Sequence, residues 1–106
     1  MISLPAYWMG RDVRYPKDCT REIQTNAMKT VDTVNKLLAM AEADGIVRNK
    51  VASGWRPKSI NDATRNAAKA SNHVMALACD IEDPDRELAQ WIIHNPEKTN
   101  RGRSIH

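Results

Sequence analysis

The feature that most constrains the fold is a short apolar segment interrupted by one carboxylate. From residue 76 to residue 81 every side chain except that of Asp80 is apolar, which is typical of a buried β-strand. A strand core rarely holds a carboxylate without a partner, because burying an unpaired charge is unfavourable. His73 lies in the polar loop just before this segment, and imidazole nitrogen and carboxylate oxygen are both ordinary zinc ligands. We therefore expect a partner for Asp80, and zinc shared with His73 is one candidate.

Spacing alone leaves two interpretations of this pair open. Seven residues of helix would span about 10.5 Å, which is too far for two ligands of one metal. Shared binding therefore requires His73 to lie on a loop that folds back over the strand of Asp80. Alternatively, Asp80 caps a turn and His73 is an exposed loop histidine.

The longest predicted element is an amphipathic helix from about Thr20 to Asp44. Apolar residues recur there at steps of three and four, as on the buried face of a helix: Ile23, Ala27, Val31, Val34, Leu38 and Ala41. Thr20 or Asp18 can cap its start, and Gly45 can end it.

The remaining elements are short. We expect an irregular arm with aromatic anchors over residues 1–17, a strand over 46–53, a short helix within 61–69, and a last strand beginning near residue 104. Asp83 and Pro84 predict the start of a helix whose buried face contains Leu88, Trp91 and Ile92. This order predicts an α+β fold, in which the long N-terminal helix packs on a small, largely antiparallel sheet.

Size and charge limit the functional classes. A chain of 106 residues fits one domain, 1–106, and its net charge of +3 comes from scattered rather than clustered lysines and arginines, so we expect no nucleic-acid partner. No apolar run approaches the roughly 18 residues of a membrane-spanning helix, and the N-terminus lacks a secretory signal pattern. Cys19 and Cys79 have no metal-knuckle spacing, so we expect two free thiols and synthesis in a reducing cytoplasm.

Two linked motifs carry a family resemblance. They are Ser53-Gly54-Trp55-Arg56-Pro57, followed by Asn61, and then Ser71-x-His73 with Ala78-x-Asp80-Ile81. In order and spacing they resemble the zinc D-alanyl-D-alanine carboxypeptidase family, which includes vancomycin-resistance carboxypeptidases and many phage cell-wall endopeptidases. The family pattern is approximately SGxR, an asparagine, and SxHxxGxAxDI, and Ala76 stands where glycine is usual. The run from Tyr7 to Asp12 and the helix with Asn26 and Asn35 are also similar to small phage-encoded members.

The resemblance implies a specific site. It implies the zinc fold of D,D-peptidases and hedgehog domains, with Zn²⁺ bound by His73, Asp80 and His106. Arg56 would face the scissile carbonyl and the substrate carboxylate, and Ser71 would hydrogen-bond the substrate. Zinc with an open coordination position acidifies water to attack a peptide carbonyl, here in the D-alanine-containing stem peptides of peptidoglycan.

The chain also departs from the family. Active members carry a carboxylate general base three residues before the last histidine, where this chain has Arg103, which cannot accept a proton. We expect a truncated or internally deleted domain with an intact metal site and impaired chemistry. In the alternative, another carboxylate approaches the zinc as base, and the candidates are Glu82, Asp83 and Glu97. His94 is a second candidate for the third ligand, although a surface histidine at a helix end is its plainer interpretation.

Two functional hypotheses follow. The first is a zinc peptidase that is made in the cytoplasm without a signal peptide and reaches the cell wall through phage lysis machinery or as part of a virion. The second is a non-catalytic, zinc-stabilised module that binds cell wall or a phage structural partner. The residues do not distinguish carboxypeptidase from endopeptidase cleavage, nor do they indicate an oligomeric state.

Overall fold

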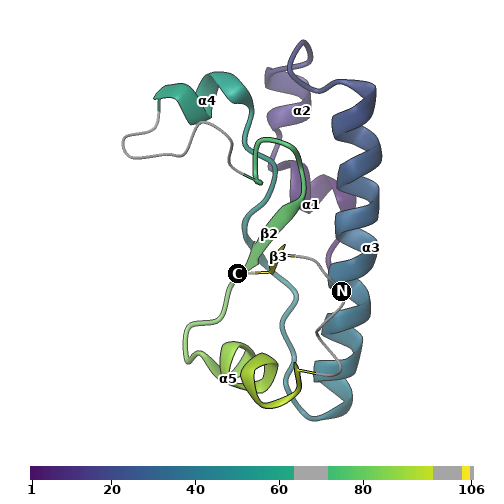
Figure 1. Cartoon of the computed structure of the whole chain (residues 1–106), viewed down its shortest axis with the longest axis vertical. Helices are drawn as coiled ribbons and strands as arrows, with labels where there is room; N and C mark the ends of the chain where they lie inside the picture. The colour runs from purple at the N-terminus through teal and green to yellow at the C-terminus, as the bar shows by residue number, and fades with distance from the viewer. Residues whose placement is uncertain (64–71, 97–103, 106) are drawn as a thin grey trace.

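The computed structural model describes residues 1–63, 72–96 and 104–105 (Figure 1). Its elements are α1 (Leu4–Trp8), α2 (Arg11–Arg14), α3 (Arg21–Ala43), β1 (Val51–Ser53), α4 (Lys58–Ala63), β2 (Ala78–Ile81), α5 (Glu87–His94) and β3 (Ser104–Ile105). Helix α3 runs along one side of the molecule for most of its length, with α5 at one end and α2 at the other (Figure 1). The predicted α+β class and the long helix are confirmed.

The sheet is small and of mixed direction, with strand order β1-β2-β3. Strands β1 and β2 are antiparallel, with Ser53 opposite Asp80 and an irregularity in the register between residues 51 and 53. Strands β2 and β3 are parallel, with Cys79 opposite Ile105. The prediction of a largely antiparallel sheet therefore holds for only one of these two pairs. The connection between β2 and β3 contains α5, and a crossover of this kind lets the chain return in the same direction.

Helix α3 begins and ends where its capping residues predict. Thr20 is the N-cap, and its hydroxyl accepts a hydrogen bond from the Ile23 N–H at 3.3 Å. Gly45 follows the helix with φ of +90°, a left-handed conformation that glycine adopts without strain. Asp18 has a different role, because its carboxylate accepts a hydrogen bond from the Ser59 hydroxyl at 3.0 Å. The apolar stripe predicted from the sequence is the buried face of the helix.

The prediction of an irregular N-terminal arm is wrong, because the arm contains α1 and α2. The Ser3 hydroxyl accepts from the Ala6 N–H at 3.2 Å and so caps α1, and the backbone turns left-handed after Trp8. The expected aromatic anchoring is confirmed. Tyr7 is fully buried, and Trp8 packs edge-on against Trp55 with ring centroids 5.4 Å apart.

Three boundaries differ from the sequence prediction. Strand β1 has only three residues, and helix α4 begins at Lys58, before the predicted range. Helix α5 begins at residue 87 rather than beside Asp83. Asp83 still caps the first turn of α5, because its carboxylate accepts hydrogen bonds from the N–H groups of Leu88 at 3.0 Å and Ala89 at 2.9 Å. Arg48 binds the same carboxylate through Nε at 3.1 Å, which ties the loop before β1 to this start.

Candidate metal centre

His73 and Asp80 lie side by side. The His73 Nε2 atom is 3.4 Å from Asp80 Oδ2, and the two side chains are 13% and 33% exposed, so the pair can be reached from solvent. His73 belongs to the turn that precedes β2, and Asp80 is on β2 itself. The turn folds back over the strand, which is the arrangement that shared metal binding requires. His73 is mostly buried, so the alternative prediction of an exposed loop histidine is wrong.

Asp80 is incompletely satisfied within the described part of the chain. Its Oδ1 atom is buried and has no hydrogen-bond partner among the described residues, whereas Oδ2 faces His73. Burying a carboxylate oxygen without a hydrogen bond lowers the free energy of unfolding, so this atom needs an explanation. Zinc is a chemically suitable partner, because two ligand atoms about 2.0–2.1 Å from a tetrahedral ion lie roughly 3.4 Å apart. The spacing of the pair therefore fits a bound zinc.

The turn that carries His73 is held in place by helix α3. Ala76, at the position where the family pattern has glycine, has a left-handed φ of +59° and is fully buried. The Thr30 hydroxyl donates to the Ala76 carbonyl at 2.7 Å, and the Asn26 amide donates to the Met75 carbonyl at 3.0 Å. Because Asn26 and Thr30 are four residues apart on one helix face, they hold two successive carbonyls of the turn.

The segment after β1 is joined directly to this turn. The Arg56 N–H donates to the His73 carbonyl at 3.1 Å, and the Trp55 indole N–H donates to the Val74 carbonyl at 3.0 Å. The His73 Nδ1 atom lies 2.9 Å from the Gly54 carbonyl oxygen. The two sequence motifs thus form one hydrogen-bonded unit. Trp55 is 1% exposed and belongs to the core.

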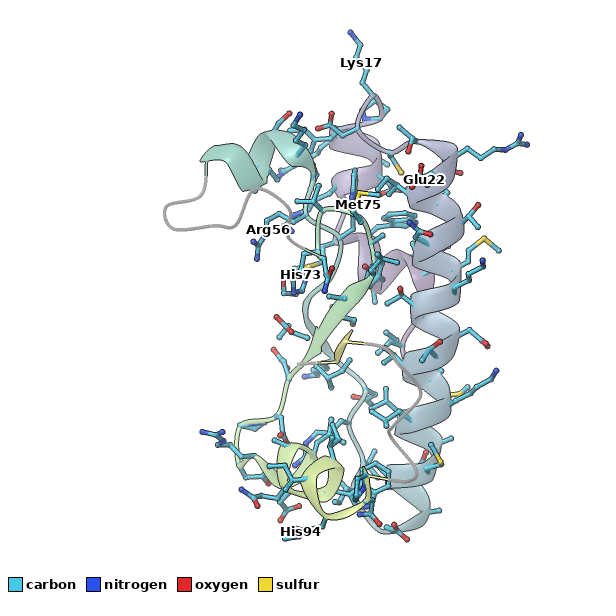
Figure 2. The ribbon with its side chains drawn as sticks, in the orientation of Figure 1. Lys17, Glu22, Arg56, His73, Met75 and His94 are labelled. Atoms are coloured by element: carbon cyan, nitrogen blue, oxygen red, sulfur yellow. The ribbon has the colours of Figure 1, made fainter. Side chains whose placement is uncertain are left out.

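Several predicted site residues can be compared with this geometry. Arg56 is half-buried and lies beside His73 (Figure 2), so the proposed substrate-binding arginine adjoins the ligand pair. His94 is exposed at the end of α5, at the far end of the molecule from His73, so it is not a third ligand (Figure 2). Asp83 is bound to Arg48 and to the start of α5, which explains it as a helix cap and not as a base. Glu82 is exposed just after β2.

Other predicted residues lie outside the described part of the chain: Ser71, Glu97, Arg103 and His106. Strand β3 ends at Ile105, opposite Cys79, so the description of the chain stops one residue before His106. Among the described residues no group of three or more His, Cys, Asp or Glu side chains is placed to hold a metal. The ligand set of His73, Asp80 and His106 stays a prediction.

The nearby thiol is not part of the pair. Both cysteines are free, and Cys79 is buried on β2 next to Asp80. Burial, together with the negative charge of Asp80, raises the pKa of the Cys79 thiol to about 12, so it stays protonated near neutral pH. Successive residues of a strand point to opposite faces, so Cys79 faces away from the side on which Asp80 meets His73.

Two supporting contacts were not predicted from the sequence. The first is the Gly54 carbonyl beside His73, which no side-chain pattern can indicate. The second is Thr30, whose hydroxyl is buried within the apolar stripe of α3. A polar residue at an apolar position of the helical repeat is the signal that could have identified it.

Compared with protein-family models, with curated proteins and with solved structures, the chain has no match. The family resemblance therefore stays a prediction. In the described part of the chain, no helix has the length and apolar character needed to cross a membrane.

Proposed function

We propose that this chain is a zinc metallopeptidase-like protein of the D-alanyl-D-alanine carboxypeptidase type, acting on D-alanine-containing stem peptides of peptidoglycan. One observation carries the zinc site. His73 Nε2 and Asp80 Oδ2 are 3.4 Å apart, while the other oxygen of Asp80 is buried without a hydrogen-bond partner in the described part of the chain.

A simple ion pair explains this geometry less well. Charge-assisted N–H···O contacts between such groups are typically about 2.7–2.9 Å long. The observed 3.4 Å is longer than that, and it leaves Asp80 Oδ1 unsatisfied. A cation bound by both side chains accounts for the longer separation and also compensates the charge of Asp80.

The proposed roles follow from the chemistry of each side chain. His73, Asp80 and His106 would hold the ion, which when bound supplies Lewis acidity toward a peptide carbonyl and acidifies water. Arg56 would bind the substrate carboxylate, since its planar guanidinium can donate two parallel hydrogen bonds. Its backbone N–H is bonded to the His73 carbonyl, which keeps the arginine next to the ligand pair. Ser71 would hydrogen-bond the substrate.

The residue at the position of the family's general base favours a second candidate function. Arg103 stands at the position of the family base, and Asp83 is engaged with Arg48 and with the start of α5. These observations support a non-catalytic, zinc-stabilised module that binds the cell wall or a phage structural partner. The two candidates share the metal site and differ in whether the chain hydrolyses a stem peptide.

Metal binding is tested first. Zinc content and affinity are measured for the chelator-treated protein and for His73→Gln, Asp80→Asn and His106→Gln, with His94→Gln as the matched control. We expect one zinc per chain in the parent protein and in the control. Loss of supporting contacts alone costs metal sites about 10–100-fold in affinity, so loss of a ligand should cost more than about 100-fold. Full occupancy in His73→Gln and Asp80→Asn, or no zinc in the parent, would refute the site.

Hydrolysis then separates the two candidates. Synthetic stem peptides ending in D-alanyl-D-alanine, and cross-linked peptidoglycan fragments, are incubated with the zinc-loaded protein with and without chelator. Cleavage that stops on chelation and in Arg56→Lys supports the peptidase. Zinc binding without cleavage of either substrate supports the non-catalytic module.

A further inference from the structure

The environment of the His73 ring is asymmetric. Its Nδ1 atom lies 2.9 Å from the Gly54 carbonyl oxygen, and its Nε2 atom faces Asp80. A carbonyl oxygen can only accept a hydrogen bond, so the proton of this contact must be on Nδ1. Asp80 Oδ2 is also only an acceptor, but its 3.4 Å separation from Nε2 is longer than an ordinary N–H···O hydrogen bond. In a neutral ring the shorter contact with Gly54 therefore keeps the proton on Nδ1 and leaves the lone pair on Nε2. The backbone at Gly54 thus selects one of the two tautomers.

The position of the Gly54 carbonyl depends on Tyr7 in helix α1. The Tyr7 carbonyl accepts a hydrogen bond from the Trp55 N–H at 3.3 Å. A Cβ atom added at Gly54 would lie 2.0 Å from the same Tyr7 oxygen, so only glycine lets the two backbones approach this closely. Trp55, which follows Gly54 in the chain, is therefore fixed against the N-terminal arm, and this fixes the position of the Gly54 carbonyl.

Tyr7 also holds the strand that carries Asp80. Its phenol hydroxyl donates to the Ala78 carbonyl of β2 at 2.8 Å, in a buried contact. The phenol is fully buried, and burial raises the pKa of Tyr7 above its ordinary value, so the hydroxyl keeps the proton that it donates. One residue thus connects the segment that orients His73 with the strand of Asp80.

We propose that the Gly54 carbonyl holds His73 as the Nδ1–H tautomer, with Nε2 presented for metal binding, and that Tyr7 is the positioning residue that sets the distance between this ring and Asp80. The inference deepens the proposed zinc site and rests on it. It gives the N-terminal arm a part in metal binding: α1 fixes the geometry of ligands that lie more than sixty residues further along the chain.

The tautomer is measured in metal-free protein, so the result does not depend on zinc binding. Long-range ¹H–¹⁵N correlation spectra of ¹⁵N-histidine-labelled protein in mildly alkaline buffer distinguish a protonated from an unprotonated ring nitrogen, and His73→Gln assigns the signals. We expect His73 to be protonated at Nδ1 only. Protonation at Nε2, or a mixture of both forms, would overturn the tautomer assignment even if zinc binds. The expected tautomer without zinc binding would leave this assignment intact and refute the proposed function.

The role of Tyr7 is measured with Tyr7→Phe and with Tyr15→Phe as the control. Tyr15 is a half-buried tyrosine at the end of α2, and its substitution removes the same hydroxyl group but keeps both contacts of Tyr7, with Trp55 and with Ala78. Both variants are measured in sucrose, which strengthens folded states. We expect Tyr7→Phe to lower zinc affinity by about 10–100-fold and to mix the His73 tautomers, and Tyr15→Phe to change neither.

A purely structural role gives a different result. Tyr7→Phe would then lower the melting temperature but keep the parent tautomer and zinc affinity well below that temperature. This outcome, or a variant that does not fold in sucrose, would make Tyr7 a structural residue and overturn its positioning role.

Discussion

Replacing Ala76 by glycine tests whether the turn that carries His73 has the conformation described above. Ala76 is fully buried, and its φ of +59° lies in the left-handed region, which is unfavourable for alanine. Ala27 provides a matched control. It is also fully buried, but it lies within helix α3, where the backbone is right-handed. Both substitutions remove one buried methyl group, so their difference isolates the effect of backbone conformation.

The expected magnitudes differ by about 2 kcal/mol. For Ala27→Gly, loss of helix propensity costs about 1 kcal/mol and loss of the buried methyl costs about 0.8 kcal/mol. For Ala76→Gly the methyl costs the same, and the extra freedom of glycine in the unfolded chain costs about 0.4–1 kcal/mol. Removing the left-handed strain of alanine stabilises the folded state by about 1–2 kcal/mol. Ala76→Gly is therefore close to neutral, whereas Ala27→Gly is destabilising by about 2 kcal/mol.

Urea unfolding followed by circular dichroism measures this difference. With an m-value of about 1–2 kcal/mol/M for a small domain, Ala27→Gly should lower the midpoint by about 1–2 M, and Ala76→Gly should leave it almost unchanged. The slopes must agree with that of the parent protein for the comparison to hold. Equal destabilisation by the two substitutions would refute the left-handed turn and the placement of His73 that depends on it.

Two further predictions concern pH. Burial alone would raise the pKa of Asp83, but hydrogen bonds from the Ala89 and Leu88 N–H groups and from Arg48 hold it below its ordinary value. A depressed pKa stabilises the fold above the unfolded value near 4, so the unfolding free energy should fall on acidification below about pH 4, and Asp83→Asn should flatten that dependence. The raised pKa of Cys79 acts in the opposite direction: stability should fall from about pH 9 toward pH 12, because only the unfolded thiol ionises there. The slope of the urea midpoint over this range should be smaller in Cys79→Ala than in the parent, and an unchanged slope would contradict the assignment. Tyr7, whose pKa burial also raises, accounts for part of the slope that remains.

Periodicity and capping residues predicted the elements that depend on local sequence. Helix α3 was predicted with both of its ends, because an apolar stripe, Thr20 and Gly45 all act locally. Helix α1 was missed, because it has only five residues, too few to show a helical period. Strand β1 was overestimated, because β-branched residues near Arg48 favour a strand locally, whereas Arg48 binds carboxylates from a distant loop.

The same distinction applies to the candidate site. His73 and Asp80 were identified from the sequence, because an unpartnered carboxylate in an apolar strand is a local anomaly. The contact of His73 with Gly54, and that of Thr30 with Ala76 in the same turn, were not identified, because they span 19 and 46 residues and use backbone carbonyl groups. Backbone acceptors leave no trace in side-chain patterns, so the sequence located the pair but not the contacts that orient it.

The contrast between Asp80 and Asp83 gives the strongest argument that Asp80 has a functional partner. Asp83 accepts two backbone hydrogen bonds and an Arg48 contact. Three residues earlier, Asp80 meets His73 at 3.4 Å and has a buried oxygen with no hydrogen-bond partner in the described part of the chain. Among the described residues, therefore, the chain satisfies the carboxylate of Asp83 fully with its own groups and leaves that of Asp80 incomplete. Local rules of burial are usually broken at functional sites, and a cation between Asp80 and His73 would complete the one carboxylate that the described chain does not.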